Sequence, residues 1–103
     1  MIKFALFARL EAKPGKEGEV EKFLEAGLAM AREEKTTPIW FALRLSPSTF
    51  GIFDAFEDEA GRQAHLTGPI AQALMAKAPE LFASAPSIES IDVLGLKNVA
   101  PAA

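Results

Sequence analysis

Apolar and polar residues alternate along several short stretches of the chain. Between residues 2 and 11 an apolar side chain recurs at every second position, which is the period of a β-strand. Residues 39–45, 49–56 and 88–97 are short stretches rich in large apolar side chains, so we expect three more strands there. Only residues 46–48 separate the second stretch from the third, and a connection this short predicts a hairpin.

Two other segments have the spacing of amphipathic helices. Residues 16–33 place apolar side chains on one face and charged side chains mostly on the other, which is typical of a helix packed on a core. Asp58 can cap a second helix over residues 59–66. The Gly-Pro pair at 68–69 separates it from a helical continuation over 70–78, because Gly suits a helix end and Pro suits a first turn.

The order of these elements is strand, helix, strand, strand, helix, strand. This order predicts an α+β protein with the ferredoxin-like β-α-β-β-α-β topology, an antiparallel sheet with its helices on one face. Pro79 and Pro86 mark the exit from the second helical region before the last strand. The Ala-rich residues 99–103 have nothing to pack against and should fray, so we expect a single domain over residues 1–98.

The predicted strands are apolar on both faces. An antiparallel sheet with helices on one face normally shows polar residues on the other. Here apolar side chains point both ways, as with Phe41 and Trp40 in the second strand, Phe53 and Ile52 in the third, and Leu94 and Val93 in the last. We therefore expect an identical sheet from a second chain to cover the free face, giving a homodimer. The alternative is that these are scattered surface hydrophobics, which are normal in monomers.

Composition narrows the possible partners and cofactors. A net charge of -3 and a pI of about 5.1 disfavour nucleic acids and anionic membrane surfaces, which attract clustered Lys and Arg. With no cysteine, one histidine and no Gly-rich phosphate loop, we expect no bound metal, haem or flavin. No apolar stretch is long enough to span a bilayer, and the first residues lack the features of a signal peptide, so the expected location is cytoplasmic.

Three side chains are candidates for chemistry. His65 is the only histidine, and its imidazole could act as a general base near neutral pH or be a structural group near a helix end. Asp54 lies within an apolar strand, so its carboxylate must be paired or have a raised pKa. It could orient His65, or form a structural ion pair with Arg44 or Arg9. Arg44 could itself hold an anion, although such arginines more often reach solvent or pair with a carboxylate.

Large apolar side chains near these positions could line a pocket, although most aromatic residues in so small a chain must simply be core. The candidates for the pocket are Trp40, Phe53, Phe56, Ile70 and Leu74.

The stretch GIFDAFEDEAGRQAHLTGPIAQALMAKAPEL resembles the antibiotic biosynthesis monooxygenase (ABM) superfamily. Asp54 and Phe56 stand where that family often has an acidic residue and an aromatic one at the end of the third strand. Asp58 and His65 match a helix that begins at an acidic cap and carries a His before a short break. The resemblance extends over essentially the whole chain through Lys97, and it implies a dimeric α+β barrel.

The chain also departs from the family pattern. Many members have a second His where Ile70 stands here, and the usual Trp is Phe56. The haem-degrading branch has an Asn, a Trp and a haem-ligating His where this chain has Ala8, Phe56 and Met75, so haem degradation is not expected.

The resemblance implies a cofactor-independent monooxygenase that oxidises a small aromatic, quinol or polyketide-type substrate with dioxygen. In that mechanism His65 removes a proton, Asp54 orients His65, Arg44 steadies the anion, and the anion reduces dioxygen directly. The competing hypothesis is a noncatalytic dimer of the same fold that binds a small ligand or is purely structural, in which His65 and Asp54 form a satisfied polar cluster.

Overall fold

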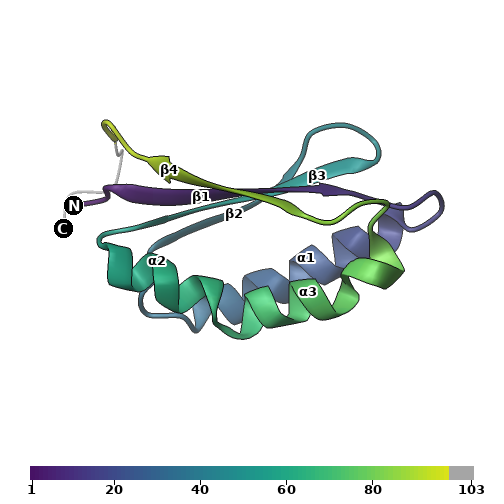
Figure 1. Ribbon diagram of the computed structural model, residues 1–103, viewed down its shortest axis with the longest axis horizontal. Coiled ribbons are helices and arrows are strands. Elements are labelled where there is room, and N and C mark those ends of the chain that lie inside the picture. Colours follow the sequence, from purple (N-terminus) through teal and green to yellow (C-terminus); the bar gives the residue numbers. More distant parts are fainter. Residues whose placement is uncertain (98–103) are drawn as a thin grey trace.

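Four strands form one antiparallel sheet that is covered on one face by three helices (Figure 1). The computed structural model describes residues 1–97. The elements in chain order are β1 (Phe4–Glu11), α1 (Glu17–Arg32), β2 (Ile39–Arg44), β3 (Thr49–Phe56), α2 (Glu59–Leu66), α3 (Pro69–Leu81) and β4 (Ser87–Asp92). The strand order is β2-β3-β1-β4, which confirms the predicted ferredoxin-like α+β fold.

The strand register decides which side chains face the helices. Leu10 of β1 lies opposite Phe50 of β3, and Leu6 lies opposite Asp54. Because successive side chains on a strand alternate between faces, the even-numbered residues of β1 and β3 all point toward the helices. The largest fully buried side chains are Leu10, Val20, Phe50 and Phe56. The core therefore fills the layer between the sheet and the helices.

The opposite face of the sheet carries a row of aromatic rings. Phe41, Phe53 and Phe7 lie opposite one another across β2, β3 and β1. The rings of Phe41 and Phe53 are 6.4 Å apart between centroids, and Phe41 is 54% exposed. The Phe7 ring lies over Gly51, where a Cβ would come within 3.0 Å of it. An apolar helix-free face is thus present on three of the four strands.

Most element boundaries lie within two residues of the prediction, and two differ by more. The last strand ends at Asp92 instead of continuing to residue 97, because Asp92 pairs with Phe4, the first residue of β1. Leu94, predicted to lie in this strand, is therefore outside it and fully exposed. The second correction is α3, which runs through Pro79 to Leu81. Proline removes one backbone hydrogen bond near the end of this helix, and the burial of Leu81 stabilises the last turn.

The predicted frayed tail, residues 99–103, lies outside the described residues, so the domain limits stay a prediction. Within residues 1–97, none of the helices combines the length and the apolar character that crossing a bilayer requires.

The start of α2 is fixed by a side-chain cap, as the sequence predicts. Asp58 has an extended backbone, and its carboxylate accepts a hydrogen bond of 2.7 Å from the backbone N–H of Gly61. This bond satisfies one of the free donors in the first turn of the helix.

We expect Asp58→Ala to lower the free energy of unfolding by about 1 kcal/mol, because the cap is lost. Urea denaturation followed by circular dichroism measures the change. The control is Asp58→Ser, whose hydroxyl can still accept the bond and which should retain most of the stability. Equal losses in both variants would show that Asp58 stabilises the fold by something other than capping.

Candidate active site

The imidazole of His65 is buried between the helices and the sheet. His65 lies in the last turn of α2, a helix that packs against β1 and β3. Only 7% of the residue is exposed, and its ring stands 5.5 Å from the ring of Phe56, at the end of β3. The break between α2 and α3 follows directly, with Gly68 as the N-cap of α3 and Pro69 in its first turn. The break predicted at this Gly-Pro pair is therefore confirmed.

Asp54 meets His65 from the sheet. It is 2% exposed and points from β3 toward the helices, opposite Leu6 on one side and Trp40 on the other. Its Oδ2 lies 2.8 Å from Nε2 of His65. Of the pairings considered for Asp54, the structure therefore contains the one with His65 and not those with Arg44 or Arg9. Arg9 instead lies beside Glu11, and Arg44 beside Glu21.

Glu34 meets His65 from the opposite side. It belongs to the loop between α1 and β2, and its Oε1 lies 2.8 Å from Nδ1 of His65. The hydroxyl of Thr37 donates a 2.7 Å hydrogen bond to the same Oε1. Each ring nitrogen of the only histidine therefore faces a carboxylate oxygen, and the ring is held by α2, by β3 and by this loop.

Glu34 is the member of this group that was absent from the sequence prediction. It follows Glu33 and precedes Lys35, so the sequence around it has the composition of a solvated surface turn. Nothing in that composition distinguishes the partly buried carboxylate at 34 from the exposed one at 33.

Burial and charge act in opposite directions on these groups. Burial alone would lower the pKa of His65, but the hydrogen bonds and negative charges of Asp54 and Glu34 together raise it above the ordinary histidine value. Burial raises the pKa of Asp54, and the hydrogen bond and charge of His65 oppose this only in part. Both shifts mean that the folded protein holds protons here more tightly than the unfolded chain does.

A narrow apolar cavity adjoins the two side chains. It has a volume of about 30 Å³, and Asp54 and His65 are its polar lining residues. The remaining lining residues are Leu6, Ala8, Ile52, Leu66, Ile70, Ala71, Leu74 and Ile88. This volume has room for about one water molecule, whereas pockets for drug-sized ligands span about 300–1,000 Å³.

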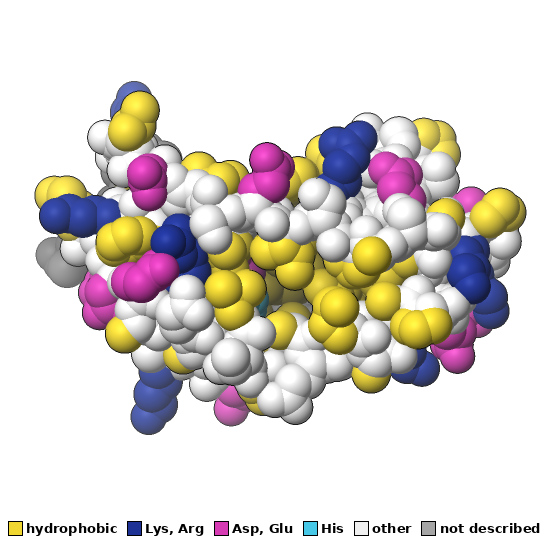
Figure 2. Space-filling model, viewed as in Figure 1, with side chains coloured by type: hydrophobic (Ala, Val, Ile, Leu, Met, Phe, Trp, Pro, Cys, Tyr) yellow, Lys and Arg dark blue, Asp and Glu magenta, His cyan; other side chains and the backbone are white. Residues whose placement is uncertain are grey.

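The cavity lies behind a hollow in the surface. Figure 2 shows this hollow, lined by hydrophobic side chains, on the side of the molecule where β4 lies in front of the other strands and above α2 and α3 in the view. Among the described elements, β4 packs closely only against β1 and makes no close backbone approach to α2 or α3. Ile88 of β4, which is 42% exposed, lines the cavity on this side.

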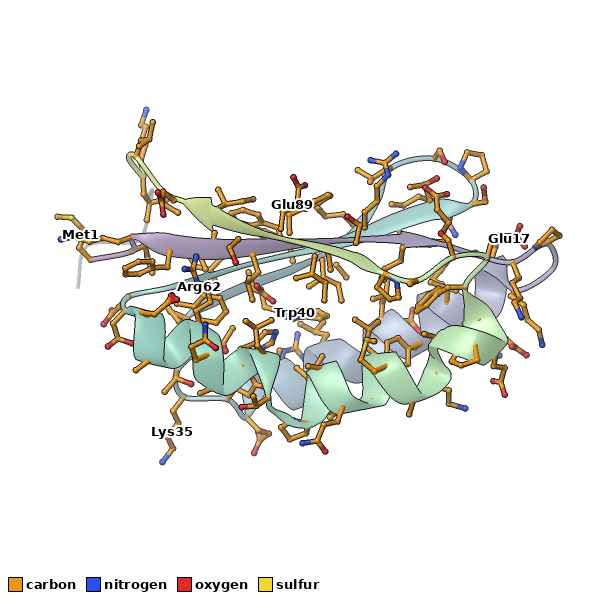
Figure 3. All side chains as sticks on the ribbon, in the orientation of Figure 1. Met1, Glu17, Lys35, Trp40, Arg62 and Glu89 are labelled. Atoms are coloured by element: carbon orange, nitrogen blue, oxygen red, sulfur yellow. The ribbon has the colours of Figure 1, made fainter. Side chains whose placement is uncertain are left out.

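Several predicted pocket residues lie on the side of the sheet that the helices cover. Ile70 and Leu74 of α3 line the cavity, and Phe56 contacts the His65 ring from beside it. Trp40 lies between the sheet and the helices (Figure 3), with its indole against α1, where a Cβ on Gly27 would be 3.3 Å away. It is absent from the cavity wall, although it stands opposite Asp54 in the strand register.

Two predicted site residues lie elsewhere. Phe53 is adjacent to Asp54 on β3 and therefore points to the opposite, helix-free face. Arg44 is four residues along β2 from the partner of Asp54, a distance of about 13 Å along the strand. Its guanidinium donates a 3.0 Å bond to Glu21 and lines a separate groove of about 310 Å³ between α1 and β2.

The carboxylates around His65 do not form a metal site. Within residues 1–97, no group of three or more acidic or histidine side chains has the arrangement of metal ligands. The reason is geometric, because Asp54 and Glu34 bind opposite nitrogen atoms of the ring and so face away from a common point.

One solved structure is close to this chain in both sequence and shape. The crystal structure of NE2512, a protein of unknown function from Nitrosomonas europaea, is 56% identical over 98% of both chains, with a TM-score of 0.93. The chain belongs to the NE2512 family. No model of a known protein family matches it, and no curated protein matches its sequence.

The NE2512-family chain also shares its fold with more distant structures. A protein from Nitrosomonas europaea named provisionally as an antibiotic biosynthesis monooxygenase has a TM-score of 0.79 at 12% identity, over 89% of this chain and 90% of that one. A protein from Caulobacter crescentus with the same provisional name has a TM-score of 0.76 at 20% identity, over 91% and 92%. At such identities the likeness shows the fold alone, and this shared fold is the one that the sequence resemblance predicts.

We expect the free energy of unfolding to fall as the pH is raised from about 6 to about 9. The pKa of His65 is raised in the folded protein, so its contribution is complete below the unfolded pKa and is lost as pH rises through the folded one. The raised pKa of Asp54 has the same sign, and its contribution begins to be lost at lower pH, above the ordinary carboxyl pKa of about 4. Urea denaturation at a series of pH values measures the slope.

The matched variant is His65→Gln, which removes the ionising ring but keeps a polar side chain. Its stability should depend less on pH than that of the unaltered chain. Identical slopes in the two proteins would contradict the assignment of the proton binding to this site.

Proposed function

We propose that the chain is a cofactor-independent monooxygenase of the ABM type that acts on a small aromatic, quinol or polyketide-type substrate. The observation that carries the proposal is the buried pair of His65 and Asp54, joined at 2.8 Å beside an apolar cavity. A titratable pair whose pKa values are shifted by burial and by each other, in a cleft, is typical of acid–base centres. Further support is the fold, which the chain shares with proteins provisionally named antibiotic biosynthesis monooxygenases.

The chemistry assigned to the site begins with a proton transfer. The His65–Asp54 pair takes the proton of a substrate hydroxyl, and the electron pair of the broken O–H bond stays on the substrate oxygen. The resulting anion is electron-rich enough to reduce dioxygen directly. One oxygen atom enters the product and the other leaves as water, whose two hydrogens come from the substrate. The apolar walls strengthen the electrostatic interactions in the cavity by excluding water.

The cavity must widen to admit an aromatic ring, since about 30 Å³ is too small for one. The structure favours entry on the side of β4, because that strand is not packed on the helices there and Ile88 stands partly exposed at the opening. Phe56, Ile70 and Leu74 would then contact the ring of the substrate. Phe53 and Arg44 have no part in this contact. Phe53 faces the opposite side of the sheet, and Arg44 lies beside the α1–β2 groove.

A second candidate function is the binding of a small ligand without turnover. It is favoured by the size of the groove between α1 and β2, which is about ten times the volume of the cavity at His65 and is mainly apolar. Arg44 and Glu21 at its edge would orient a polar group of the ligand. In this case the groups around His65 serve only the fold.

Oxygen uptake separates the two functions. With a panel of hydroquinones and hydroxylated polycyclic phenols, we expect the protein to accelerate dioxygen consumption. His65→Ala and Asp54→Asn should each lower turnover by about 10²–10⁴-fold, the usual contribution of a positioned acid or base. Arg44→Gln serves as the control and should leave the rate unchanged. If only Arg44→Gln loses turnover, the reaction takes place in the α1–β2 groove. If no substrate causes dioxygen uptake, the result favours the ligand-binding function.

We also propose that two copies associate through the helix-free face of the sheet in the cytoplasm. The support is the aromatic row of Phe41, Phe53 and Phe7 on this face. A sheet face of this composition is stabilised when it is removed from water, by roughly 25 cal/mol per Å² of apolar surface.

Substitution of Phe41 by Lys should convert the dimer into a monomer, because it places a charge on the covered face. The control is Met75→Lys on α3, since Met75 is 56% exposed against 54% for Phe41 but belongs to the helical layer. Sedimentation equilibrium at micromolar concentration should give twice the chain mass of 11.1 kDa for the unaltered protein and the control. A monomeric unaltered protein would refute the association.

A further inference from the structure

The two carboxylates at His65 set the number of protons that the imidazole holds. A neutral imidazole carries one N–H, so it can donate to one carboxylate only. Its other nitrogen would then turn a lone pair toward an oxygen lone pair of the second carboxylate at 2.8 Å. With Nδ1 facing Glu34 and Nε2 facing Asp54 at equal distances, both contacts are favourable when both nitrogens carry a proton.

The number of protons on His65 depends on the imidazole itself and on the carboxylates of Asp54 and Glu34. The hydroxyl of Thr37 donates to Glu34 and also lies 3.5 Å from Nδ1 of His65, so it adds a polar contact and no charge. Arg62 of α2 is bonded to Glu59 and to the carbonyl oxygens of Ala5 and Ile91, away from the imidazole. From β1 and α3 only apolar side chains line the cavity beside His65. The negative charge that retains the second ring proton is therefore that of Glu34 and Asp54.

Asp54 has one oxygen that this pairing leaves free. Its Oδ2 faces His65, while its Oδ1 is buried and has no hydrogen-bond partner among the described residues. A buried carboxylate oxygen without a partner is destabilising, and it is a strong acceptor for a donor that enters beside it. Asp54 lines the cavity, so a substrate hydroxyl in the widened cavity would approach this residue.

We propose that Glu34 is a positioning residue that keeps His65 doubly protonated, so that Oδ1 of Asp54, rather than His65, takes the substrate's proton. The inference rests on the proposed function of the site for the identity of the substrate, a compound with an acidic aromatic hydroxyl. In the step, the substrate O–H bond breaks, an O–H bond forms at Asp54 Oδ1, and the electron pair remains on the substrate oxygen. The imidazolium keeps Asp54 ionised beforehand and stays beside the new anion.

The charge of His65 can be measured without any substrate. Because the chain has a single histidine, nitrogen-15 NMR of the labelled protein reports one imidazole. At pH 7.5 we expect both ring nitrogens of the unaltered protein to carry a proton. In Glu34→Gln the titration midpoint should fall by about 1–3 pH units, the effect of removing an adjacent opposite charge. Glu33→Gln removes the same charge from the neighbouring exposed position and should leave the midpoint unchanged.

Two NMR results would overturn the role of Glu34. One is a neutral ring in the unaltered protein at pH 7.5, a measurement that needs no variant to fold. The other is an unchanged midpoint in Glu34→Gln with native backbone amide spectra, since a merely structural Glu34 would not control the ring's charge.

The identity of the base follows from a comparison of two pH profiles. If Asp54 is the acceptor, oxygen uptake with the active hydroquinone persists at pH values where NMR shows a fully charged His65. If activity is lost as the pH is lowered, with the same midpoint as the titration of His65, then His65 is the base and the assignment to Asp54 is wrong. Absence of any turnover refutes the proposed function and with it the proton-transfer step, whereas the NMR result decides the role of Glu34 separately.

Discussion

The buried imidazole of His65 is the point at which the segments around the cavity are joined. It contacts Asp54 in the middle of the sheet and Glu34 in the loop after α1, and it is carried by α2. Charged groups in an apolar interior are tolerated only when they are paired, and removal of one partner typically costs about 3–5 kcal/mol because the other charge is left buried. The position of α2 against the sheet and the path of the loop before β2 therefore depend on the same few hydrogen bonds.

The pairing of His65 with the two carboxylates accounts for the shape of the helical layer. A single continuous helix after β3 would carry its axis straight across the sheet. Instead Asp58 caps the start of α2 just after β3, and α2 ends at Leu66 with Thr67 as its C-cap, directly before the Gly-Pro pair. The chain then changes direction into α3, whose Ile70 and Leu74 form the remaining wall of the cavity. The break in the helix and the cavity are thus parts of one arrangement.

Periodicity predicted the fold well because the fold depends on which residues are buried. The period-two pattern located β1, the content of large apolar residues located β3, and the turn residues located the hairpin and the helix break. The pattern was misleading at Leu94 and Leu96, because the apolar residues continue past Asp92, whereas the ladder with β1 ends there and is followed by one further backbone bond, from the N–H of Val93 to the carbonyl of Lys3. A strand needs a partner as well as a pattern, and the partner's length cannot be seen in the strand's own sequence.

The candidate site could be predicted only where local rules apply. Asp54 was noticeable as a carboxylate in an apolar strand, and His65 as the only histidine. Glu34 was not noticeable, because its burial results from the approach of α2, which is distant in sequence. Phe53 was misplaced even though neighbouring strand residues point to opposite faces, so the period-two rule already separated it from Asp54. Arg44 shares the face of Asp54 and is excluded only by distance along β2.

The strand order leaves β2 and β4 at the two edges of the sheet, and these edges differ in their side chains. β4 reads SIESID, in which Glu and Asp interrupt the apolar residues, and charges of this kind discourage a foreign strand from pairing with an edge. β2 reads IWFALR, with a single charge at its end and the high β-propensity of sequences that stack into fibrils. Its preceding Pro38 and terminal Arg44 are the residues that limit such stacking. The first surface at which a partly unfolded population of this protein would aggregate is therefore the free edge of β2.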